Sequence, residues 1–453
     1  MRGLVNVDHI EGKYSMSRAI SVIVALVLAS GSVGSAQDLF ITNARIVDPA
    51  AREILTGNLL IENGVIVGNP SVRPAGFTGQ TIDVQGKWVI PGLNELHTHS
   101  YGNMAPGNVN DAPGTAAVAR RMLYAGVTSF LDLFGDEETL FNVRRRQQDG
   151  ELGGADLFTS LSCLTATSGH CTEYGVPTRT MDSPDEARGQ VNAIAEKAAD
   201  VVKIIYAPQG GMPSIDKETF AAAVETANAR GIKTVVHIES WQDVRDAVEV
   251  GASAVTHVPD QQRIPPDLAR LMAERGVYSI PTLAALTDFR NFVTDQSVLG
   301  HTMATRLTTQ EILDAYRTQD VIDRVREWRE EMDSAHANVM ASVKAMSVAG
   351  VTILTGTDAG NWGTIQGYSV HRELELLVQA GLSEWQALAG STTNAGEFLG
   401  QPFGVNDGDV ANFVVLDASP VEDIRNTLGI VMVVHHGVVV DREAILATSR
   451  NPN

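Results

Sequence analysis

Short apolar runs bounded by turn residues occupy both ends of the chain. Residues 38–68 contain β-rich runs broken by Asn-Gly and proline, and residues 408–441 repeat this texture with longer apolar stretches. Runs of this kind between turn signals are typical of antiparallel strands. We therefore predict that the two ends pair into one β-sandwich domain, formed by residues 37–88 and 400–453.

The region between the ends, residues 89–399, has a different pattern. Apolar runs of four to seven residues alternate there with helical patterns, which is typical of βα units around a parallel sheet. Eight strands are predicted, as one closed barrel requires, and they begin at Trp88, Thr128, Leu157, Val201, Thr234, Ala254, Tyr278 and Val351. The predicted fold class is α/β, a (β/α)8 TIM barrel with a small β-sandwich.

Helical patterns lie between the predicted strands. One helix is expected from Ser214 to Arg230, closed by Gly231. The interval at about 285–349 is longer than one crossover helix needs, and its charged stretch 311–346 has a helical pattern. Because this interval follows the seventh strand, we expect a helical insertion on the catalytic side of the barrel, where it acts as a lid or specificity element.

The N-terminal residues have the pattern of a secretory signal peptide. Met16 is followed by Ser-Arg, the 11-residue apolar run Ala19–Ala29 and small residues that include Gly34 and Ala36. This run is too short to cross roughly 30 Å of hydrocarbon. We expect residues 1–36 to be a signal peptide whose true start is Met16, which makes the mature protein periplasmic or secreted, with no membrane association after cleavage. An uncleaved membrane anchor is the alternative.

Composition narrows the partners. The 453 residues include 54 acidic and 34 basic side chains, for a net charge of −20, and no run rich in Lys or Arg occurs. Because binding to a phosphate backbone relies on clustered positive charge, no nucleic-acid partner is expected. Cys163 and Cys171 are the two cysteines, and either a short disulfide or two unpaired thiols fits them. Homo-oligomerisation is left open.

Polar residues in the predicted barrel strands carry the candidate chemistry. His97 and His99 end the first barrel strand, and alternation along a strand points both imidazoles to one side. Lys203 lies inside the apolar run Val-Val-Lys-Ile-Ile, where an unpaired ammonium is costly to bury. In a structural role, the Lys203 side chain extends from the strand end into solvent or pairs with a carboxylate. In a functional role, its neutral amine has captured CO2 to form a carbamate that bridges two metals.

Further candidates follow the later strands. His237 and His257 occupy two successive strand ends, and Asp358 follows the last strand in Gly-Thr-Asp-Ala-Gly. A lone histidine on an apolar strand is more often a structural residue than a ligand. Candidates on five of the predicted barrel strands, in chain order, favour a metal centre at the barrel rim.

This ordered set resembles the amidohydrolase superfamily over residues 38–445. The matching features are Pro91-Gly92-Leu93-Asn94-Glu95-Leu96-His97-Thr98-His99, Lys203, His237, His257 and Thr357-Asp358-Ala359-Gly360. Within the superfamily the sequence is most similar to the imidazolonepropionase-like and prolidase-like dipeptidase branch. The resemblance implies a distorted barrel with a β-sandwich and two divalent ions, expected to be Zn2+. It also implies that His97, His99 and Asp358 bind one ion, His237 and His257 bind the other, and carboxylated Lys203 bridges them.

The activity implied by the resemblance is metal-assisted hydrolysis of an amide or peptide-like bond in a small molecule. A bridging hydroxide would attack, one ion would polarise the carbonyl, and Asp358 would move the proton to the leaving amine. His170 and Tyr206 are candidate substrate contacts, and Glu239 is a candidate for orienting an imidazole. His435 and His436 are interpreted as structural.

Three other functions remain open at this point. The first is a mononuclear deaminase or cyclic-amide hydrolase in which Lys203 is merely structural. The second is a lactone or phosphoester hydrolase on the same metals, because a metal pair activates water whatever the leaving group. The third is an inactive scaffold barrel, against which the retention of every expected ligand argues.

Overall fold

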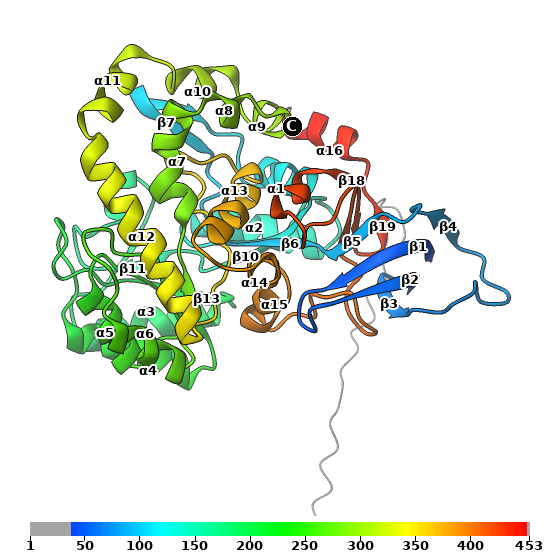
Figure 1. The fold of residues 1–453 in the computed structure, drawn as a ribbon. Helices are drawn as coiled ribbons and strands as arrows, with labels where there is room; N and C mark the ends of the chain where they lie inside the picture. Colours follow the sequence, from blue (N-terminus) through cyan, green and yellow to red (C-terminus); the bar gives the residue numbers. More distant parts are fainter. Residues whose placement is uncertain (1–37, 451–453) are drawn as a thin grey trace, which may run out of the picture.

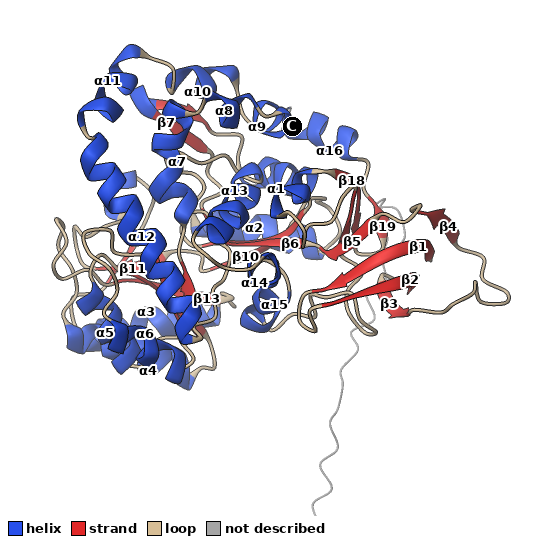
Figure 2. Cartoon of the chain, viewed as in Figure 1, coloured by secondary structure: helices blue, strands red, loops and turns tan. Residues whose placement is uncertain are grey.

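The computed structural model describes residues 38–450, so the predicted signal peptide and its start at Met16 lie outside the described residues. The chain has the predicted α/β architecture, with a barrel and a sheet built from both chain ends (Figures 1 and 2). No helix within residues 38–450 is both long enough and apolar enough to cross a bilayer.

Strands from the two chain ends share one eight-stranded sheet (Figure 1). C-terminal β17 pairs antiparallel with β5, and β5 pairs parallel with β1 near the N-terminus. The strands are β1 (Leu39–Asp48), β2 (Glu53–Glu62), β3 (Val65–Gly68), β4 (Gln80–Asp83), β5 (Trp88–Pro91), β17 (Phe413–Leu416), β18 (Ile430–His435) and β19 (Val438–Val439). Apolar side chains from both ends, including Ile41, Val89 and Phe413, form a hydrophobic cluster of their own.

One strand prediction is wrong. The apolar pattern predicts that the run at Trp88 is a barrel strand, but β5 lies between β1 and β17 in the chain-end sheet. The first barrel strand is instead β6 (Leu93–Thr98), which begins after Gly92. All four residues of β5 are buried. A fully buried strand has the same apolar pattern in either sheet, so the sequence could not tell which sheet would pair with it.

The barrel is closed but distorted. Its strands are β6, β9 (Val127–Asp132), β10 (Asp156–Thr159), β11 (Cys163–Thr165), β13 (Val201–Ile205), β14 (Lys233–His237), β15 (Ala254–Thr256) and β16 (Tyr278–Ile280). The segment 351–359 closes the ring, because Leu354 N–H donates to Ser279 O at 2.8 Å and Leu96 N–H donates to Thr355 O at 2.9 Å. The third strand is split in two: β10 pairs with β9, whereas β11 pairs with β13.

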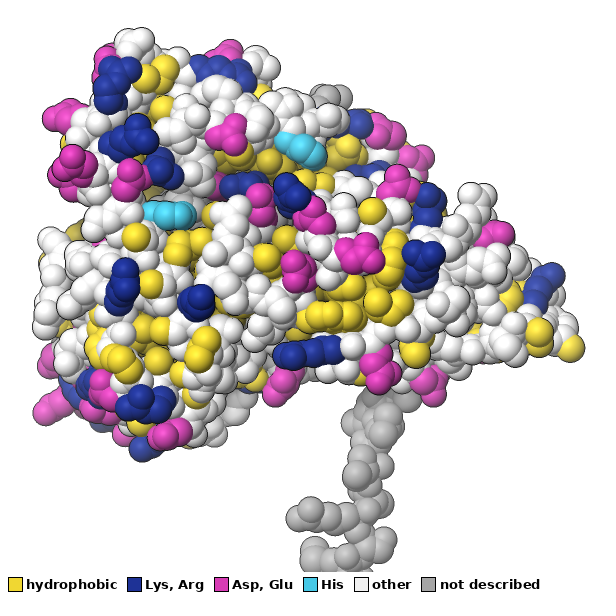
Figure 3. All heavy atoms as spheres, viewed as in Figure 1, with side chains coloured by type: hydrophobic (Ala, Val, Ile, Leu, Met, Phe, Trp, Pro, Cys, Tyr) yellow, Lys and Arg dark blue, Asp and Glu magenta, His cyan; other side chains and the backbone are white. Residues whose placement is uncertain are grey.

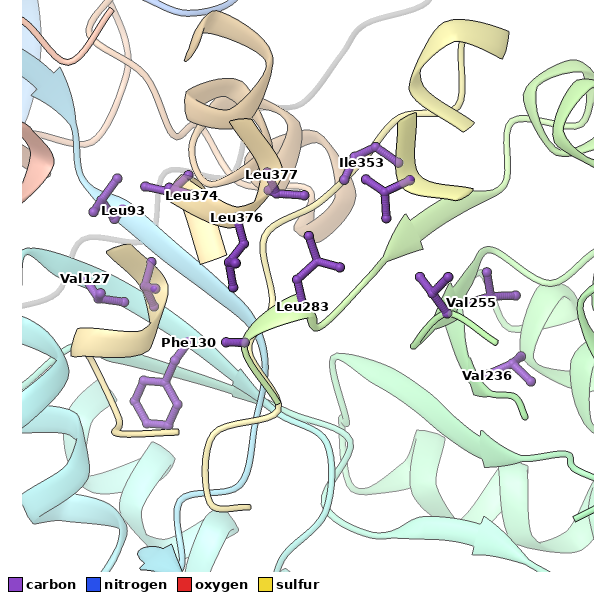
Figure 4. Close-up of a cluster of buried hydrophobic side chains, with 14 of the residues drawn as sticks. Leu93, Val127, Phe130, Val236, Val255, Leu283, Ile353, Leu374, Leu376 and Leu377 are labelled. Atoms are coloured by element: carbon purple, nitrogen blue, oxygen red, sulfur yellow. The ribbon is translucent and has the colours of Figure 1, made fainter. Parts of the chain in front are cut away.

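Apolar side chains fill the barrel and the layer outside it. Leu96, Val201 and Ile280 belong to the inner cluster. The outer cluster joins strand residues to the surrounding helices, and Figure 4 shows Leu374, Leu376 and Leu377 of α13 (Tyr368–Gln379) near Leu93 of β6. Both layers hold the strands in place, so the polar residues at the strand ends have a rigid support.

Helices surround the strands as the alternating pattern predicted. They are α1 (Thr115–Tyr124), α2 (Glu137–Gln148), α3 (Pro184–Glu196), α4 (Lys217–Ala229), α5 (Trp241–Glu249), α6 (Pro266–Glu274), α14 (Glu384–Gly390), α15 (Thr393–Leu399) and α16 (Arg442–Arg450), together with α13. The helix predicted from Ser214 begins at Lys217 instead. The Asp216 side chain accepts a hydrogen bond from Thr219 N–H and so caps it, while Ser214 Oγ accepts from Ala207 N–H in the preceding loop.

The interval after the seventh strand is helical, as predicted, but it contains several helices. They are α7 (Leu283–Thr294), α8 (Gln296–Gly300), α9 (Thr302–Leu307), α10 (Gln310–Ala315), α11 (Gln319–Glu327) and α12 (Arg329–Ala349). The predicted stretch 311–346 is therefore broken, and α12 packs back against α6 and α7. On the face shown in Figure 3, acidic and basic side chains are interspersed.

Candidate metal centre

All six residues predicted as metal ligands line one cavity of about 430 Å³: His97, His99, Lys203, His237, His257 and Asp358. They come from, or directly follow, the carboxyl ends of barrel strands. Because parallel strands end on the same face of a barrel, residues far apart in sequence meet there.

His97, His99 and Asp358 form the tightest group. The Nε2 atoms of His97 and His99 lie 3.2 and 3.0 Å from Asp358 Oδ1, and the ligand atoms of all three lie within 4.8 Å of one another. Burial raises the pKa of the Asp358 carboxyl, but the two imidazoles outweigh it and hold this pKa well below its usual value. The carboxylate is therefore anionic and positioned between two imidazole nitrogens.

The imidazoles continue along the rim as a connected row. Ring centroids are 5.0 Å apart for His97 and His257, 4.7 Å for His257 and His237, and 4.8 Å for His237 and His170. Burial lowers the pKa of His97 to about 3 and that of His237 to about 4, and it also lowers the pKa of His257 well below its usual value. These rings are neutral at pH 7, which is the form that binds a metal.

Two threonine hydroxyls orient the rings. Thr256 Oγ1 lies 2.5 Å from His97 Nδ1 and donates to Ile280 O, so its oxygen accepts the hydrogen bond from the imidazole. Thr282 Oγ1 lies 2.8 Å from His257 Nδ1. With Nδ1 held in this way, Nε2 is the nitrogen left for a ligand, an arrangement common around metal-binding histidines. Sequence reasoning missed both threonines, although each lies within two residues of a strand end.

Lys203 and His237 each carry a buried nitrogen that has no hydrogen-bond partner in the described part of the chain. Lys203 is 3% exposed, and among the described residues it makes no hydrogen bond and no ion pair; burial lowers its pKa to about 8. His237 Nε2 is buried and forms no hydrogen bond within residues 38–450, and Glu239 Oε1 is 3.8 Å from it. Buried polar groups normally have partners, and nitrogen donors around an anionic oxygen fit divalent transition metals.

The backbone is strained where the ligands are presented. His257, Thr282 and Asp358 have φ values of 73°, 53° and 58°, in the left-handed region that non-glycine residues rarely adopt. Such strain persists only where the surrounding structure enforces it, and it concentrates at functional sites.

Gly356 lies where the segment 351–359 passes close to its neighbouring strands. A Cβ at this position would meet Ile280 Cγ2 at 2.4 Å and His97 Cβ at 2.9 Å. The first glycine of Gly-Thr-Asp-Ala-Gly is thus a packing requirement.

Glu95 is a third residue that sequence reasoning missed. It is fully buried and accepts hydrogen bonds from His97 N–H, Thr357 N–H and the Thr357 hydroxyl. Burial raises its pKa to about 8. Glu95 therefore ties the strand that carries His97 to the segment that carries Asp358. The available signal was a carboxylate inside the predicted strand, two positions before His97.

The two predicted substrate contacts differ in position. His170 lines the cavity, and its Nδ1 lies 2.7 Å from Glu173 Oε1. Tyr206 does not face the cavity; its hydroxyl donates to Asp246 Oδ2 at 2.7 Å and its ring stacks on Phe220. The prediction that Tyr206 contacts substrate is corrected by this geometry. Lys203 and Ile205 face the cavity, so the next residue along the strand points outward to the helices.

Other residues complete the cavity and its mouth. Tyr101 stacks on His99 with an interplanar angle of 8°. A neighbouring cavity shares Tyr174, Asp358 and other residues with the first and adds Met104, Ala285 and Trp362.

The two cysteines are free thiols, which is one of the two states that the sequence allowed. Cys171 lines the cavity, and Cys163 packs with it in a buried cluster.

A distorted barrel that gathers histidines and an aspartate at its rim has the architecture of a metal-dependent hydrolase. Residues 88–440 match the sequence model of the amidohydrolase family. The chain belongs to this family, in agreement with the predicted superfamily, and is an enzyme of the type that hydrolyses carbon–nitrogen bonds.

Individual relatives are distant. An uncharacterized protein of Mycobacterium tuberculosis is 22% identical over 370 residues, which is 80% of this chain and 86% of its own. An adenine deaminase of Geobacillus kaustophilus is 33% identical over 264 residues, 55% of this chain and 40% of its own. Among solved structures, a Xaa-Pro dipeptidase with methionine in its active site superposes with a TM-score of 0.72 at 18% identity, covering 89% of this chain and 99% of its own. This structural likeness supports the predicted fold.

Proposed function

We propose that this protein is a dinuclear metal-dependent amidohydrolase that cleaves an amide or peptide-like carbon–nitrogen bond. The observation that carries the proposal is the shared cavity of His97, His99, Lys203, His237, His257 and Asp358. A mononuclear site would need only His97, His99 and Asp358. The buried, unpartnered Lys203 beside two further imidazoles is what favours a second ion.

The residues divide into two ligand sets. His97, His99 and Asp358 would hold one ion, His237 and His257 the other, and Lys203, as a carbamate, would contribute an oxygen to each. When bound, two divalent cations, Zn2+ in this proposal, supply Lewis-acid polarisation of the substrate carbonyl and a lowered pKa of water. Burial prepares Lys203 for carbamate formation, because a pKa of about 8 greatly increases the fraction of neutral amine at pH 7.

Asp358 is the proton carrier in this proposal. Its carboxylate reaches the cavity and is anionic, so it accepts the proton of the attacking water. It then returns that proton to the nitrogen of the cleaved bond, because an amine leaves only after it is protonated. The strained backbone at Asp358 and the contacts of Thr357 with Glu95 hold the carboxylate in position for both transfers.

The charges around the cavity favour a substrate without a free carboxylate. Lys203 is the one Lys or Arg among the described lining residues, whereas Glu239 and Asp260 are acidic. A carboxylate on the substrate would meet these two groups with no basic side chain left to pair with it. The adjoining cavity at Met104, Leu286 and Trp362 suits an apolar substituent. We therefore favour a neutral or amine-bearing amide with an apolar group.

Export is part of the proposal and rests on the sequence alone. The segment 16–36 has the order of charge, apolar run and small residues that secretory signals have. N-terminal sequencing of the protein recovered from the periplasm or medium should begin after Ala36. Recovery of the protein only from the cytoplasm with residues 1–36 intact would contradict export.

Metal counting tests the two ligand sets separately. Elemental analysis should show that His97→Ala/His99→Ala loses one ion relative to wild type, that His237→Ala/His257→Ala also loses one, and that Lys203→Ala loses at least one and is inactive. Lys233→Ala, on the first residue of β14, is the matched control and should keep every ion. Unchanged metal content in His237→Ala/His257→Ala would contradict the dinuclear site.

A substrate panel tests the reaction. Neutral amides with an apolar acyl group should be hydrolysed faster than N-acyl amino acids and dipeptides with free carboxylates. Lactones and phosphotriesters test the alternative of ester chemistry, and adenine tests a deaminase, which the 33% identity to an adenine deaminase over 264 residues keeps in view. Turnover confined to lactones, phosphotriesters or adenine would overturn the amide proposal.

A further inference from the structure

Three metal-binding side chains meet on the side of the barrel that faces the chain-end sheet. Asp156 is the first residue of β10, His435 is the last residue of β18, and His436 follows it. Their ligand atoms lie within 4.8 Å of one another. Asp156 belongs to the barrel and the two histidines belong to the chain-end sheet, so the group spans the contact between these two parts.

This group is separate from the rim cavity. Asp156 pairs with Ser129, and Ser129 pairs with Asn94 on β6, so Asp156 is level with the start of β6. His97 and His99 follow Asn94 by three and five residues, which at roughly 3.3 Å per residue places them about 10 and 16 Å away along the strand direction. Asp156, His435 and His436 line no part of the rim cavity.

A tight turn brings the adjacent histidines together. Side chains of successive strand residues point to opposite faces, so His435 and His436 would diverge in a regular strand. The register His435–Val438 leaves His436 and Gly437 as a two-residue hairpin loop with φ values of 49° and 74°. This left-handed turn rotates the His436 side chain, and both Nε2 atoms approach Asp156.

Neighbouring groups hold the turn in this position. Asn412 Oδ1 accepts a hydrogen bond of 2.6 Å from His436 N–H. Gly437 packs so closely on the adjacent hairpin that a Cβ there would lie 2.7 Å from Gly64 Cα. The two imidazoles are therefore presented by a supported backbone.

The side-chain geometry leaves one nitrogen unsatisfied. His436 Nε2 lies 3.0 Å from Asp156 Oδ1 and His435 Nε2 lies 3.4 Å from Asp156 Oδ2. His435 Nε2 is buried and has no hydrogen-bond partner among the described residues. The His435 side chain is 11% exposed, so solvent has little access to this nitrogen. Two imidazole nitrogens and a carboxylate are a common Zn2+ ligand set, and bonds of about 2.0–2.2 Å in a tetrahedron separate ligands by spacings close to these.

We propose that Asp156, His435 and His436 bind a divalent transition metal ion, and that this ion holds the β18–β19 hairpin against the barrel. Zn2+ is the ion used to test the site. His436 is 53% exposed, so solvent completes the coordination. The ion is structural, because its ligands are outside the rim cavity. The competing arrangement is a metal-free cluster in which Asp156 pairs with one or both imidazoles.

The experiment uses the full mature chain. Wild type, Asp156→Asn, His436→Asn and His435→Asn/His436→Asn are stripped with a chelator, reloaded with Zn2+ and dialysed, and then analysed for metal content and thermal unfolding. Each variant should carry one ion fewer than wild type and should lose the rise in Tm that Zn2+ gives through this site. Turnover of the reloaded enzyme should be unchanged. His436→Asn changes the most exposed of the three side chains and serves if the double variant does not fold.

His301→Asn is the matched control. His301 Nδ1 accepts a hydrogen bond from Met303 N–H at a helix start, which asparagine also does well, and His301 belongs to neither candidate metal group. This control should keep the wild-type ion count. Equal metal content in wild type and all three variants would overturn the proposal and show a metal-free cluster. Because the comparison is a difference of one ion, it holds whether the rim binds one ion or two.

Discussion

Histidines gather around an aspartate in two regions of this molecule, at the rim of the barrel and at its contact with the chain-end sheet. At the rim, five imidazoles and Lys203 surround a cavity of about 430 Å³ that a small molecule can enter. At the other region, two imidazoles and Asp156 join two parts of the chain and line no part of that cavity. The two groups offer similar ligand types, and we expect the adjoining cavity, which the Asp156 group lacks, to decide which one supports catalysis.

Backbone strain separates the two regions as well. His436 has a φ of 49°, but it lies in a hairpin turn of the type that requires positive φ. His257 and Asp358 adopt φ values of 73° and 58° directly after barrel strands, where no tight hairpin requires them. Contacts such as those of Glu95 with Thr357 enforce the rim conformation, which in the proposed mechanism positions groups for chemistry rather than for a turn.

The largest difference between the regions should appear on removing an aspartate charge. Asp358→Asn should lower kcat by about 10²–10⁴-fold, because the variant loses the group that moves the proton. Asp156→Asn should leave kcat unchanged. Steady-state kinetics on metal-loaded protein with a good amide substrate measures both. An unchanged kcat in Asp358→Asn would contradict the role of proton carrier, and a large loss in Asp156→Asn would erase the distinction between the regions.

A smaller effect is expected at the hydroxyl that holds a rim imidazole. Thr282→Ala removes the partner of His257 Nδ1 and should reduce metal affinity or kcat by about 10–100-fold, as loss of such supporting contacts typically does. Thr282→Ser keeps the hydroxyl and is the matched control, so it should restore most of the loss. Competition with a chelator gives the metal affinity. Equal affinity in the alanine and serine variants would show that the hydroxyl does not position His257.

His170 tests whether the row of rim imidazoles extends beyond the metal ligands. His170→Gln should raise KM by about 10-fold, the effect of losing one moderately strong hydrogen bond of roughly 1.4 kcal/mol. Metal content should stay at the wild-type value, since His170 lies beside His237 but is outside both ligand sets. A loss of metal in His170→Gln would make His170 a ligand instead of a substrate contact.

The smallest catalytic effect is expected on the outward side of the strand that carries Lys203. Tyr206→Phe removes the hydrogen bond to Asp246 and should lower the free energy of unfolding by about 1 kcal/mol, with kcat/KM unchanged. Urea denaturation and steady-state kinetics provide the two numbers. A clear fall in kcat/KM at unchanged metal content would return Tyr206 to the substrate site.

Much of the fold and of the rim was predictable from local patterns. The placement of His97, His99, Lys203, His237, His257 and Asp358 at one face of the barrel required only the alternation of strands and helices and the rule that parallel strands end on one face. The direction of Tyr206 was also within reach, because Lys203 and Tyr206 are an odd number of residues apart and so face opposite sides of the strand.

Local patterns could not show which distant segments become neighbours. The sheet that includes Trp88, the threonines that hold His97 and His257, and the contact of Glu95 with Thr357 all join residues that are far apart in the chain. The approach of His435 and His436 to Asp156 spans about 280 residues and depends on one hairpin turn. The sequence by itself determined the periodicity, the strand order and the chemistry at each strand end, because these depend on neighbours along the chain. Only the tertiary structure decided the pairing of buried polar groups, because that pairing arises when closure of the barrel and docking of the chain-end sheet bring remote segments within hydrogen-bonding distance.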